Sequence, residues 1–230
     1  MDLKANLKRV RARIANACLR ASRAPTSVVL IAVTKNVDAA TIQALIEAGV
    51  RHIAENRQQV ATEKLPMVPG LNVKRRPMLH FIGPLQRNKV KRVLSRFDVI
   101  HSVDSLALAH EIGTQAAGLG RDIGVFVEFN VAGEEQKHGF EVAAAAEAMA
   151  EITKIPRLHV LGLMCMAPYS DNAESARPYF KALAALSRDL REGGHMPAGA
   201  DRLSMGMSGD FEVAIEEGAT HVRIGSALFE

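Results

Sequence analysis

Lys35 is the residue of this sequence best placed for covalent chemistry. It follows VVLIAV at 28–33, an apolar run that predicts a buried strand. A lysine at the exit of such a strand can be partly desolvated. Desolvation favours the neutral amine, which is the form that attacks an aldehyde to give a Schiff base. The competing interpretation is a surface lysine at a strand end, with no chemistry of its own.

Two segments near the C-terminus combine glycine with serine, as anion-binding loops do. They are SMGMSGD at 204–210 and RIGS at 223–226, and each begins in a predicted strand. Ser208 and Asp210 precede a predicted helix, whose first amides favour negative charge, and glycine lets an anion approach the backbone. Turn glycines with a serine cap are the alternative.

Short β-rich runs alternate with helical stretches along the chain, a pattern typical of βα units around a parallel sheet. Helical spacing over 37–49 ends at Gly49, and Asp104 is expected to cap a later helix. The predicted strands are 28–33, 51–54, 78–83, 98–102, 123–130, 158–164, 202–205 and 221–226.

Eight such repeats close into a barrel more readily than they form an open sheet. We therefore predict an α/β fold, a single TIM-type (β/α)8 barrel domain over residues 1–230, with an extra N-terminal helix at 1–22 packed on the barrel. A doubly wound open sheet is the alternative. TIM barrels carry their sites at the carboxyl ends of the strands, where Lys35 and both glycine–serine segments fall.

The first and last strands of a closed barrel are neighbours, so Lys35 is expected to face the segments at 204–210 and 223–226. An amine beside an anion cradle suits a phosphorylated aldehyde. Two classes of compound fit: a sugar phosphate, as in a Schiff-base aldolase, and pyridoxal 5′-phosphate (PLP). The spacing of the residues does not choose between them.

Five sequence segments, in order along the chain, distinguish between these two classes of compound. AVTKNVDAATIQALIEAGVRHIAENRQQ, HFIGPLQRNK, HSVDS, GLMCMAPYSD and RLSMGMSGDFEVAIEEGATHVRIGSALF resemble the PLP homeostasis protein family, also called the YggS or PROSC family. The resemblance runs from about residue 28 to the end of the chain. That family is similar in fold to the barrel domain of alanine racemase.

The resemblance implies that PLP is held covalently on Lys35 and that Asn56 lines its ring. It implies that Arg223 faces the pyridine nitrogen, with His80 and Met207 near the cofactor. It assigns the phosphate to four residues of the last two segments: Ser204, Ser208, Gly225 and Ser226.

Arg223 bears on whether the chain is an enzyme. Arginine stays protonated and has no acceptor, so it donates to an unprotonated pyridine nitrogen and opposes a pyridinium. The ring is then a weaker electron sink than one with an Asp partner. Racemisation also needs a base on each face of the substrate carbon, and the racemase takes its tyrosine from a second domain that this chain is not expected to have. Tyr169 is the tyrosine that could reach the mouth, whereas Tyr179 is expected to pack within a helix.

We therefore expect a protein that stores, delivers or buffers PLP and is not an enzyme. A PLP-dependent, racemase-like amino-acid enzyme is the alternative. The expected partners are PLP, related B6 vitamers and PLP-dependent apoenzymes, and Lys137 is a second lysine that could hold PLP transiently. A monomer is expected because the domain that dimerises the racemases is absent.

Composition argues against several other classes. The formal charge is +4, but no aromatic residues interleave the basic clusters, so no nucleic-acid partner is expected. Cys18 and Cys165 lie far apart and no histidines have metal-ligand spacing, so neither a disulfide framework nor a metal is expected. With no apolar signal region and no apolar stretch near ~20 residues, we expect no membrane partner and a cytoplasmic location.

Overall fold

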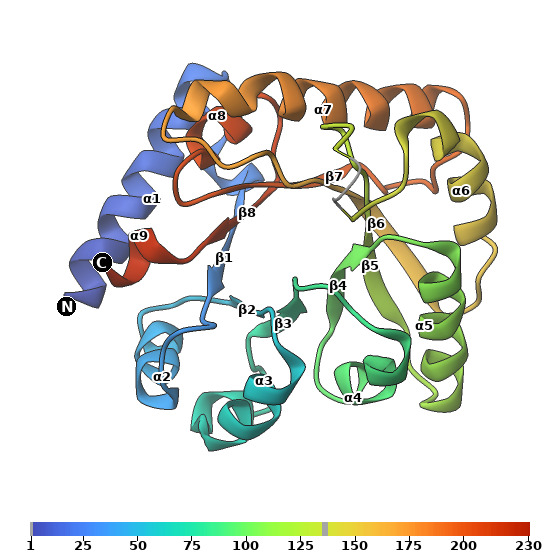
Figure 1. The fold of residues 1–230 in the computed structure, drawn as a ribbon. Coiled ribbons are helices and arrows are strands. Elements are labelled where there is room, and N and C mark those ends of the chain that lie inside the picture. The colour runs from blue at the N-terminus through green and yellow to red at the C-terminus, as the bar shows by residue number, and fades with distance from the viewer. Residues whose placement is uncertain (1, 135–137) are drawn as a thin grey trace.

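The structure is a computed structural model that describes residues 2–134 and 138–230. Its strands run parallel and close into a barrel in chain order, with helices around it (Figure 1). The predicted (β/α)8 barrel is confirmed, and the open-sheet alternative is wrong. The strands are β1 (Val29–Val33), β2 (His52–Glu55), β3 (Met78–Phe81), β4 (Val99–Val103), β5 (Ile123–Glu128), β6 (Leu158–Met164), β7 (Arg202–Met207) and β8 (His221–Ile224).

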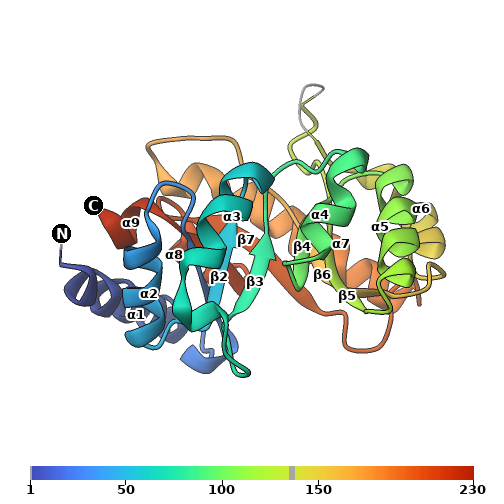
Figure 2. The same cartoon turned by 90° about the horizontal axis from the view of Figure 1, so that it is seen from below.

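Helices cover the outside of the barrel, and Figure 2 shows them from a second direction. They are α1 (Leu3–Arg20), α2 (Ala39–Glu47), α3 (Gln58–Lys64), α4 (Val90–Leu94), α5 (Leu106–Gly118), α6 (Ala145–Ile152), α7 (Arg177–Glu192), α8 (Phe211–Glu216) and α9 (Ser226–Phe229). All eight predicted strands are present, displaced by at most two residues at either end.

The predicted N-terminal helix, α1, packs on the barrel against α8 and α9. Asn6 Nδ2 donates to the carbonyl of Leu228 at 3.1 Å. Arg13 pairs with Glu212 at 3.1 Å, and its guanidinium lies 4.5 Å from the centre of the Phe211 ring. The two ends of the chain consequently lie side by side in both views.

Apolar side chains pack on both faces of the strands, which explains why the strand sequences are nearly continuous apolar runs. On β1, Ala32 belongs to the main core between barrel and helices, whereas Ile31 and Val33 lie on the opposite face, in the barrel lumen, with Ala54. The lumen is not wholly apolar. Its buried polar residues include His80, His101, Ser204, His221 and Arg223.

Two local predictions need correction. Ser105, not Asp104, caps α5, and its hydroxyl accepts from the N–H of Leu108 at 3.4 Å. The Asp104 carboxylate is engaged elsewhere, because it accepts from the Ser105 hydroxyl at 3.2 Å and pairs with His138. The last strand ends at Ile224, the last residue of β8 with a partner on β1, and the chain then turns into α9.

Two absences hold for the described residues. No helix among them is both long and apolar enough to cross a bilayer. No three or more of their His, Cys, Asp and Glu side chains are grouped so that they could hold a metal ion. The thiols of Cys18 and Cys165 are buried and free.

Glycine is required where α8 packs on β7. Gly206 has φ +91°, which side chains rarely adopt. A Cβ at this position would lie 2.5 Å from the Cβ of Ala214 and 2.9 Å from the Cα of Phe211. The close approach of α8 therefore depends on the missing side chain.

We expect Gly206→Ala to lower the free energy of unfolding by about 3 kcal/mol or more, because strained φ and overpacking each cost about 1–3 kcal/mol. Urea unfolding measures the loss. Gly209→Ala is the matched control, since Gly209 has open space around it. Equal losses in the two variants would contradict this account of Gly206.

Candidate cofactor site at the barrel mouth

Lys35 lies in a turn at the barrel mouth, the end of the barrel where the strands finish. The N–H of Val37 closes the turn by donating to the carbonyl of Thr34 at 3.2 Å. The side chain of Lys35 is exposed, so the expectation of partial desolvation is wrong for this structure. The physical reason is that the buried part of the chain ends one residue earlier, at Thr34.

A buried ion pair, which sequence reasoning missed, holds the chain just before Lys35. Glu55 Oε1 accepts from the Thr34 hydroxyl at 2.6 Å and pairs with Lys64 Nζ at 2.8 Å. Lys64 Nζ also donates to the carbonyl of Thr34 at 2.7 Å. These contacts tie the ends of β1 and β2 to the last turn of α3, so the base of the Lys35 turn is fixed. In the sequence, the sign of this ion pair was Glu55, a single glutamate in a short strand.

The Lys35 turn leaves the barrel beside the segment that follows β8. β1 and β8 are paired, with Ala32 opposite Ile224. A Cβ on Gly225 would lie 3.7 Å from the Cβ and the carbonyl oxygen of Val33. The amine-bearing turn and one of the two predicted anion loops are therefore neighbours, as the order of a closed barrel requires.

The loops after β7 and β8 converge on one hydroxyl. Ser208 Oγ accepts from the N–H of Gly225 at 3.1 Å and from that of Ala227 at 3.3 Å. Ser226, between these two amides, is exposed. Backbone donors aimed at one oxygen are the arrangement that phosphate-binding loops use. Met207, at the end of β7, donates its N–H to Asp210 Oδ1 at 2.6 Å.

Arg223 lies beneath these loops, buried within the lumen. Its Nη1 donates to the carbonyl and hydroxyl oxygens of Ser204 at 2.8 and 2.7 Å, and its Nη2 donates to the carbonyl of Cys165 at 3.0 Å. A guanidinium has five N–H donors, so two remain for another acceptor. Burial lowers the pKa of Arg223, but arginine stays protonated in proteins.

Ser204, predicted to contact the phosphate, and His80, predicted to lie near the cofactor, are both buried. The Ser204 hydroxyl is fully buried within β7 and is bonded to Arg223 and His101. His80, on β3, is buried between His52 and His101. Ser204 therefore binds Arg223 within the lumen, while Ser208, Gly225 and Ser226 lie at the mouth.

Glu128, at the end of β5, is a buried carboxyl that sequence reasoning also missed. Burial, with a further contribution from Asp104, raises its pKa to about 7, against the opposing pull of Arg223. Burial likewise raises the pKa of Asp210. In the sequence, Glu128 stands out as the charged residue of the otherwise apolar segment that ends in FVEF.

Asn56 follows β2 directly and carries an oxygen without a partner. Its Oδ1 is buried and accepts no hydrogen bond within the described chain, and the same is true of Glu55 Oε2. Its backbone crosses Gly83 so closely that a Cβ there would overlap the Asn56 carbonyl. Buried acceptors are rarely left unpaired, so this edge of the mouth has hydrogen-bonding capacity for a ligand.

The remaining candidates lie elsewhere. The Tyr169 side chain is 89% exposed, and its hydroxyl donates to Asp171 Oδ1 at 3.0 Å, which raises its pKa. Tyr179 is half-buried and packs against the main core, as predicted. Lys137 lies outside the described residues.

Comparisons with known proteins decide the family. The family model of the alanine racemase N-terminal domain matches residues 2–230. The pyridoxal phosphate homeostasis protein of Aquifex aeolicus is 40% identical over 229 residues, covering 100% of this chain and 98% of that protein. The protein of the same name from Escherichia coli is 36% identical, covering 99% and 96%. The chain belongs to the pyridoxal phosphate homeostasis protein family.

Solved structures agree with this family. PipY of Synechococcus elongatus, with PLP bound, has 33% identity and a TM-score of 0.81, covering 96% of this chain and 100% of that one. Alanine racemase of Clostridium difficile matches with a TM-score of 0.76 and 17% identity, covering 99% of this chain and 56% of that one. At that identity the racemase shows a shared fold alone.

Buried histidines in the lumen give the fold a pH dependence whose sign can be worked out. Burial lowers the pKa values of His80 and His101 well below 6.5, and that of His221 to about 3. A histidine with a lowered folded pKa gives its full stability above pH 6.5 and loses it as pH falls. Glu128, with its raised pKa, acts in the opposite direction over the same range.

We expect the free energy of unfolding to fall as the pH is lowered from 7 to 5. The stabilising contribution of each of the three histidines decreases by about 2 kcal/mol, whereas that of Glu128 increases by about 2 kcal/mol. Chemical unfolding at the two pH values measures the change. His221→Gln should reduce it, whereas His195→Gln, which alters an exposed histidine, should not. Stability that is constant across this range would contradict the burial of neutral imidazoles.

Proposed function

We propose that this chain binds PLP at the barrel mouth, through a reversible Schiff base on Lys35, and serves in PLP homeostasis by storing or delivering the cofactor. The observation that best supports this proposal is the neighbourhood of Lys35. Lys35 follows β1 beside Gly225, where two backbone amides converge on one hydroxyl above a buried arginine. Full-length relatives bear the name pyridoxal phosphate homeostasis protein, and the solved PipY structure holds PLP. That relative favours PLP over the sugar phosphate.

The donor set fits PLP at each of its functional groups. PLP supplies an aldehyde that condenses reversibly with a primary amine, and Lys35 is the exposed amine at the mouth. Ser208, Gly225 and Ser226 are assigned to the phosphate, whose oxygens can replace the Ser208 hydroxyl as acceptor of the two amides. Asn56 contributes its unpaired oxygen after β2, the strand paired with β1 on the side away from β8.

Arg223 is assigned to the pyridine nitrogen, with Met207 and His80 as neighbours of the ring. Its two unused N–H groups can donate to an unprotonated ring nitrogen, and its fixed positive charge opposes protonation there. The ring held in this way is a weak electron sink, which suits storage of an aldehyde better than turnover.

A carrier role is supported by the position of Tyr169. Tyr169, the tyrosine that could have opposed Lys35, is exposed and bonded to Asp171. The observation that favours a racemase-like enzyme instead is Glu128, because a carboxyl with a pKa of about 7 suits proton transfer.

The monomeric state, the cytoplasmic location, the single-domain extent and the apoenzyme partners stay predictions.

We expect Lys35→Arg to abolish covalent attachment, because a guanidinium keeps the charge but does not condense with an aldehyde. The protein is incubated with PLP, reduced with borohydride and digested, and mass spectrometry locates the pyridoxyl group. Lys89→Arg, near the mouth but outside the site, is the control and should label like the unchanged protein. A pyridoxyl group found mainly on another lysine would overturn the assignment.

Turnover is tested separately. With PLP bound, we expect no exchange of the Cα hydrogen of alanine and other amino acids for solvent deuterium, because the Tyr169 hydroxyl is exposed and bonded to Asp171. Nuclear magnetic resonance follows the Cα signal. Exchange that disappears in both Lys35→Arg and Glu128→Gln would establish the racemase-like alternative.

A further inference from the structure

A row of hydrogen bonds crosses the barrel lumen and ends on Arg223. His52 Nδ1 lies 3.0 Å from His80 Nε2, and His80 Nδ1 lies 2.9 Å from His101 Nε2. His101 Nδ1 lies 2.8 Å from Ser204 Oγ, which accepts from Arg223 Nη1 at 2.7 Å. These five residues, named here the histidine row, join β2, β3 and β4 to β7 and β8.

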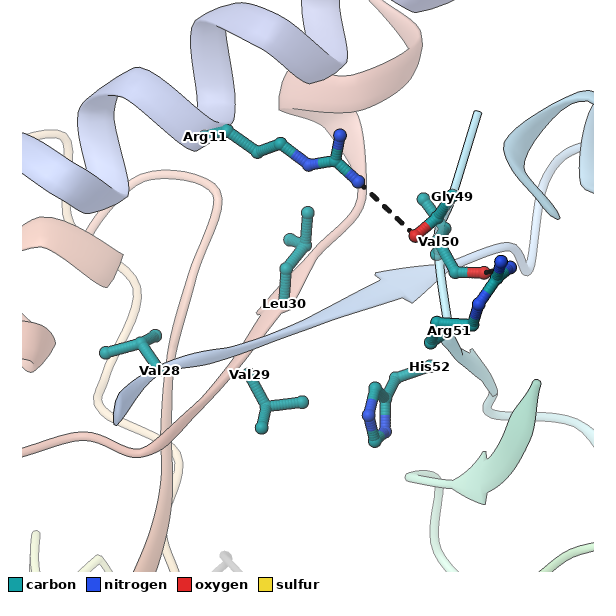
Figure 3. A pocket seen from close by; sticks show the side chains of 8 residues that line it. All are labelled: Arg11, Val28, Val29, Leu30, Gly49, Val50, Arg51 and His52. Carbon is teal, nitrogen blue, oxygen red and sulfur yellow. Dashed lines mark hydrogen bonds between the residues drawn. The ribbon is translucent and has the colours of Figure 1, made fainter. Parts of the chain in front are cut away.

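The two ends of the row differ in their surroundings. His80, His101, Ser204 and Arg223 are buried, whereas His52 is half-buried. His52 lines a cleft of about 240 Å³ at the far end of the barrel from the mouth, beside α1 and the starts of β1 and β2 (Figure 3). The row therefore runs from a solvent-reaching cleft to the underside of the proposed cofactor site.

Arg223 determines which way every proton in the row points. A guanidinium only donates, so Ser204 Oγ accepts from Arg223 and keeps one proton to give. The partner described for that proton is His101 Nδ1. His101 then carries its proton on Nε2 and donates to His80 Nδ1, and His80 donates from Nε2 to His52 in turn. The reverse order would leave the buried Ser204 hydroxyl without an acceptor among the described groups.

The row is also held neutral. His80 and His101 use both ring nitrogens within it, so a second proton on either ring would break a link. Burial, reinforced by neighbouring positive groups, lowers the pKa of both. The other titratable or charged groups that face the row are Arg202, His221, Cys165, Glu128 and Asp210.

Packing leaves the central imidazole little freedom to turn away. The ring of His101 stacks on Phe126 with centroids 4.4 Å apart and an interplanar angle of 27°. Phe126 is fully buried and contacts His221 edge to face on its other side, with centroids 5.1 Å apart. The ring that bonds to Ser204 is therefore fixed by apolar contacts as well as by hydrogen bonds.

We propose that His80 and His101 are positioning residues of the cofactor site, which act through Ser204 to hold the Arg223 guanidinium in place with a single order of protons. This inference rests on the proposed function, because Arg223 is there assigned to the ring nitrogen of PLP. A row in which each hydroxyl and imidazole has one fixed donor and one fixed acceptor keeps the guanidinium from tilting. The two N–H groups left over then point in one direction.

The proton order can be read directly in the full-length protein before PLP is added. Nitrogen-15 NMR of the histidine rings distinguishes the two neutral tautomers. We expect His80 and His101 to carry their proton on Nε2 and to stay neutral at pH 6. A proton on Nδ1 of either ring would overturn the inference.

Ser204→Ala tests whether the order comes from the Arg223 end. Without the hydroxyl, His101 Nδ1 lacks its partner in either order, as a bare lone pair in one and as an N–H in the other. The hydroxyl then no longer selects one order, so we expect mixed tautomers at His101 and also at His80, which Ser204 does not touch. Ser204→Thr keeps a hydroxyl and should restore the single order. His221→Phe, a buried lumen histidine outside the row, is the matched control and should leave it unchanged. An unaltered order in Ser204→Ala would contradict the inference.

Binding of PLP supplies the second readout. We expect Ser204→Ala to weaken PLP binding about tenfold, the equivalent of one lost hydrogen bond to a charged group, with Ser204→Thr and His221→Phe close to the unchanged protein. Equal binding by Ser204→Ala and the unchanged protein would overturn the positioning role. If the unchanged protein takes up no PLP, the proposed function fails, while the tautomers still decide the proton order.

Discussion

The site depends on keeping the charge of Arg223 inside the barrel. A buried cation is costly unless its donors are met, and three of its N–H groups are met by oxygens of Ser204 and Cys165. Those oxygens belong to a residue inside β7 and to the residue after β6, so the guanidinium ties β6, β7 and β8 together. The loops that carry Ser208 and Gly225 follow β7 and β8. The interaction that stabilises the arginine therefore also helps to position these loops.

Two lysines lie near the end of β1, and their different surroundings suit them to different roles. Lys64 is engaged by the carboxylate of Glu55 at 2.8 Å and by the carbonyl of Thr34 at 2.7 Å. An ammonium has no lone pair and does not attack an aldehyde. Lys35 is exposed and lies one residue beyond the point that Lys64 fixes. Lys64 therefore orients the turn, and Lys35 is left as the amine that can react.

Sequence reasoning reached the barrel because strand and helix periodicity is a local property. Eight apolar runs separated by helical spacing were enough to give the strand order, and the lysine and glycine–serine segments then fell at one end. The lumen could not be predicted in the same way. His52, His80 and His101 lie on the successive paired strands β2, β3 and β4, but their sequence does not show that their rings meet inside the lumen. His221 lies on β8, and closure of the barrel brings it into the same lumen.

The same limitation applies to individual residues. Ser204 was grouped with Ser208 because both lie in one glycine-rich string, yet Ser204 is inside β7 and Ser208 beyond it. Whether a residue in such a string faces the lumen or the mouth depends on where the strand stops. That point is set by pairing with its neighbours, which a single sequence does not display.

The likeness to alanine racemase shows that very different sequences adopt this barrel. The barrel of this chain superposes on the racemase with a TM-score of 0.76 although only 17% of residues are identical. A barrel of this fold can therefore belong to proteins of different function. Turnover requires in addition a proton acceptor opposite the lysine, in reach of a substrate carbon. Burial raises the pKa of the Glu128 carboxyl to about 7, and Arg223 opposes that rise. The proton of Glu128 is therefore coupled to the buried arginine, which favours a role in balancing that charge over one in attacking a substrate.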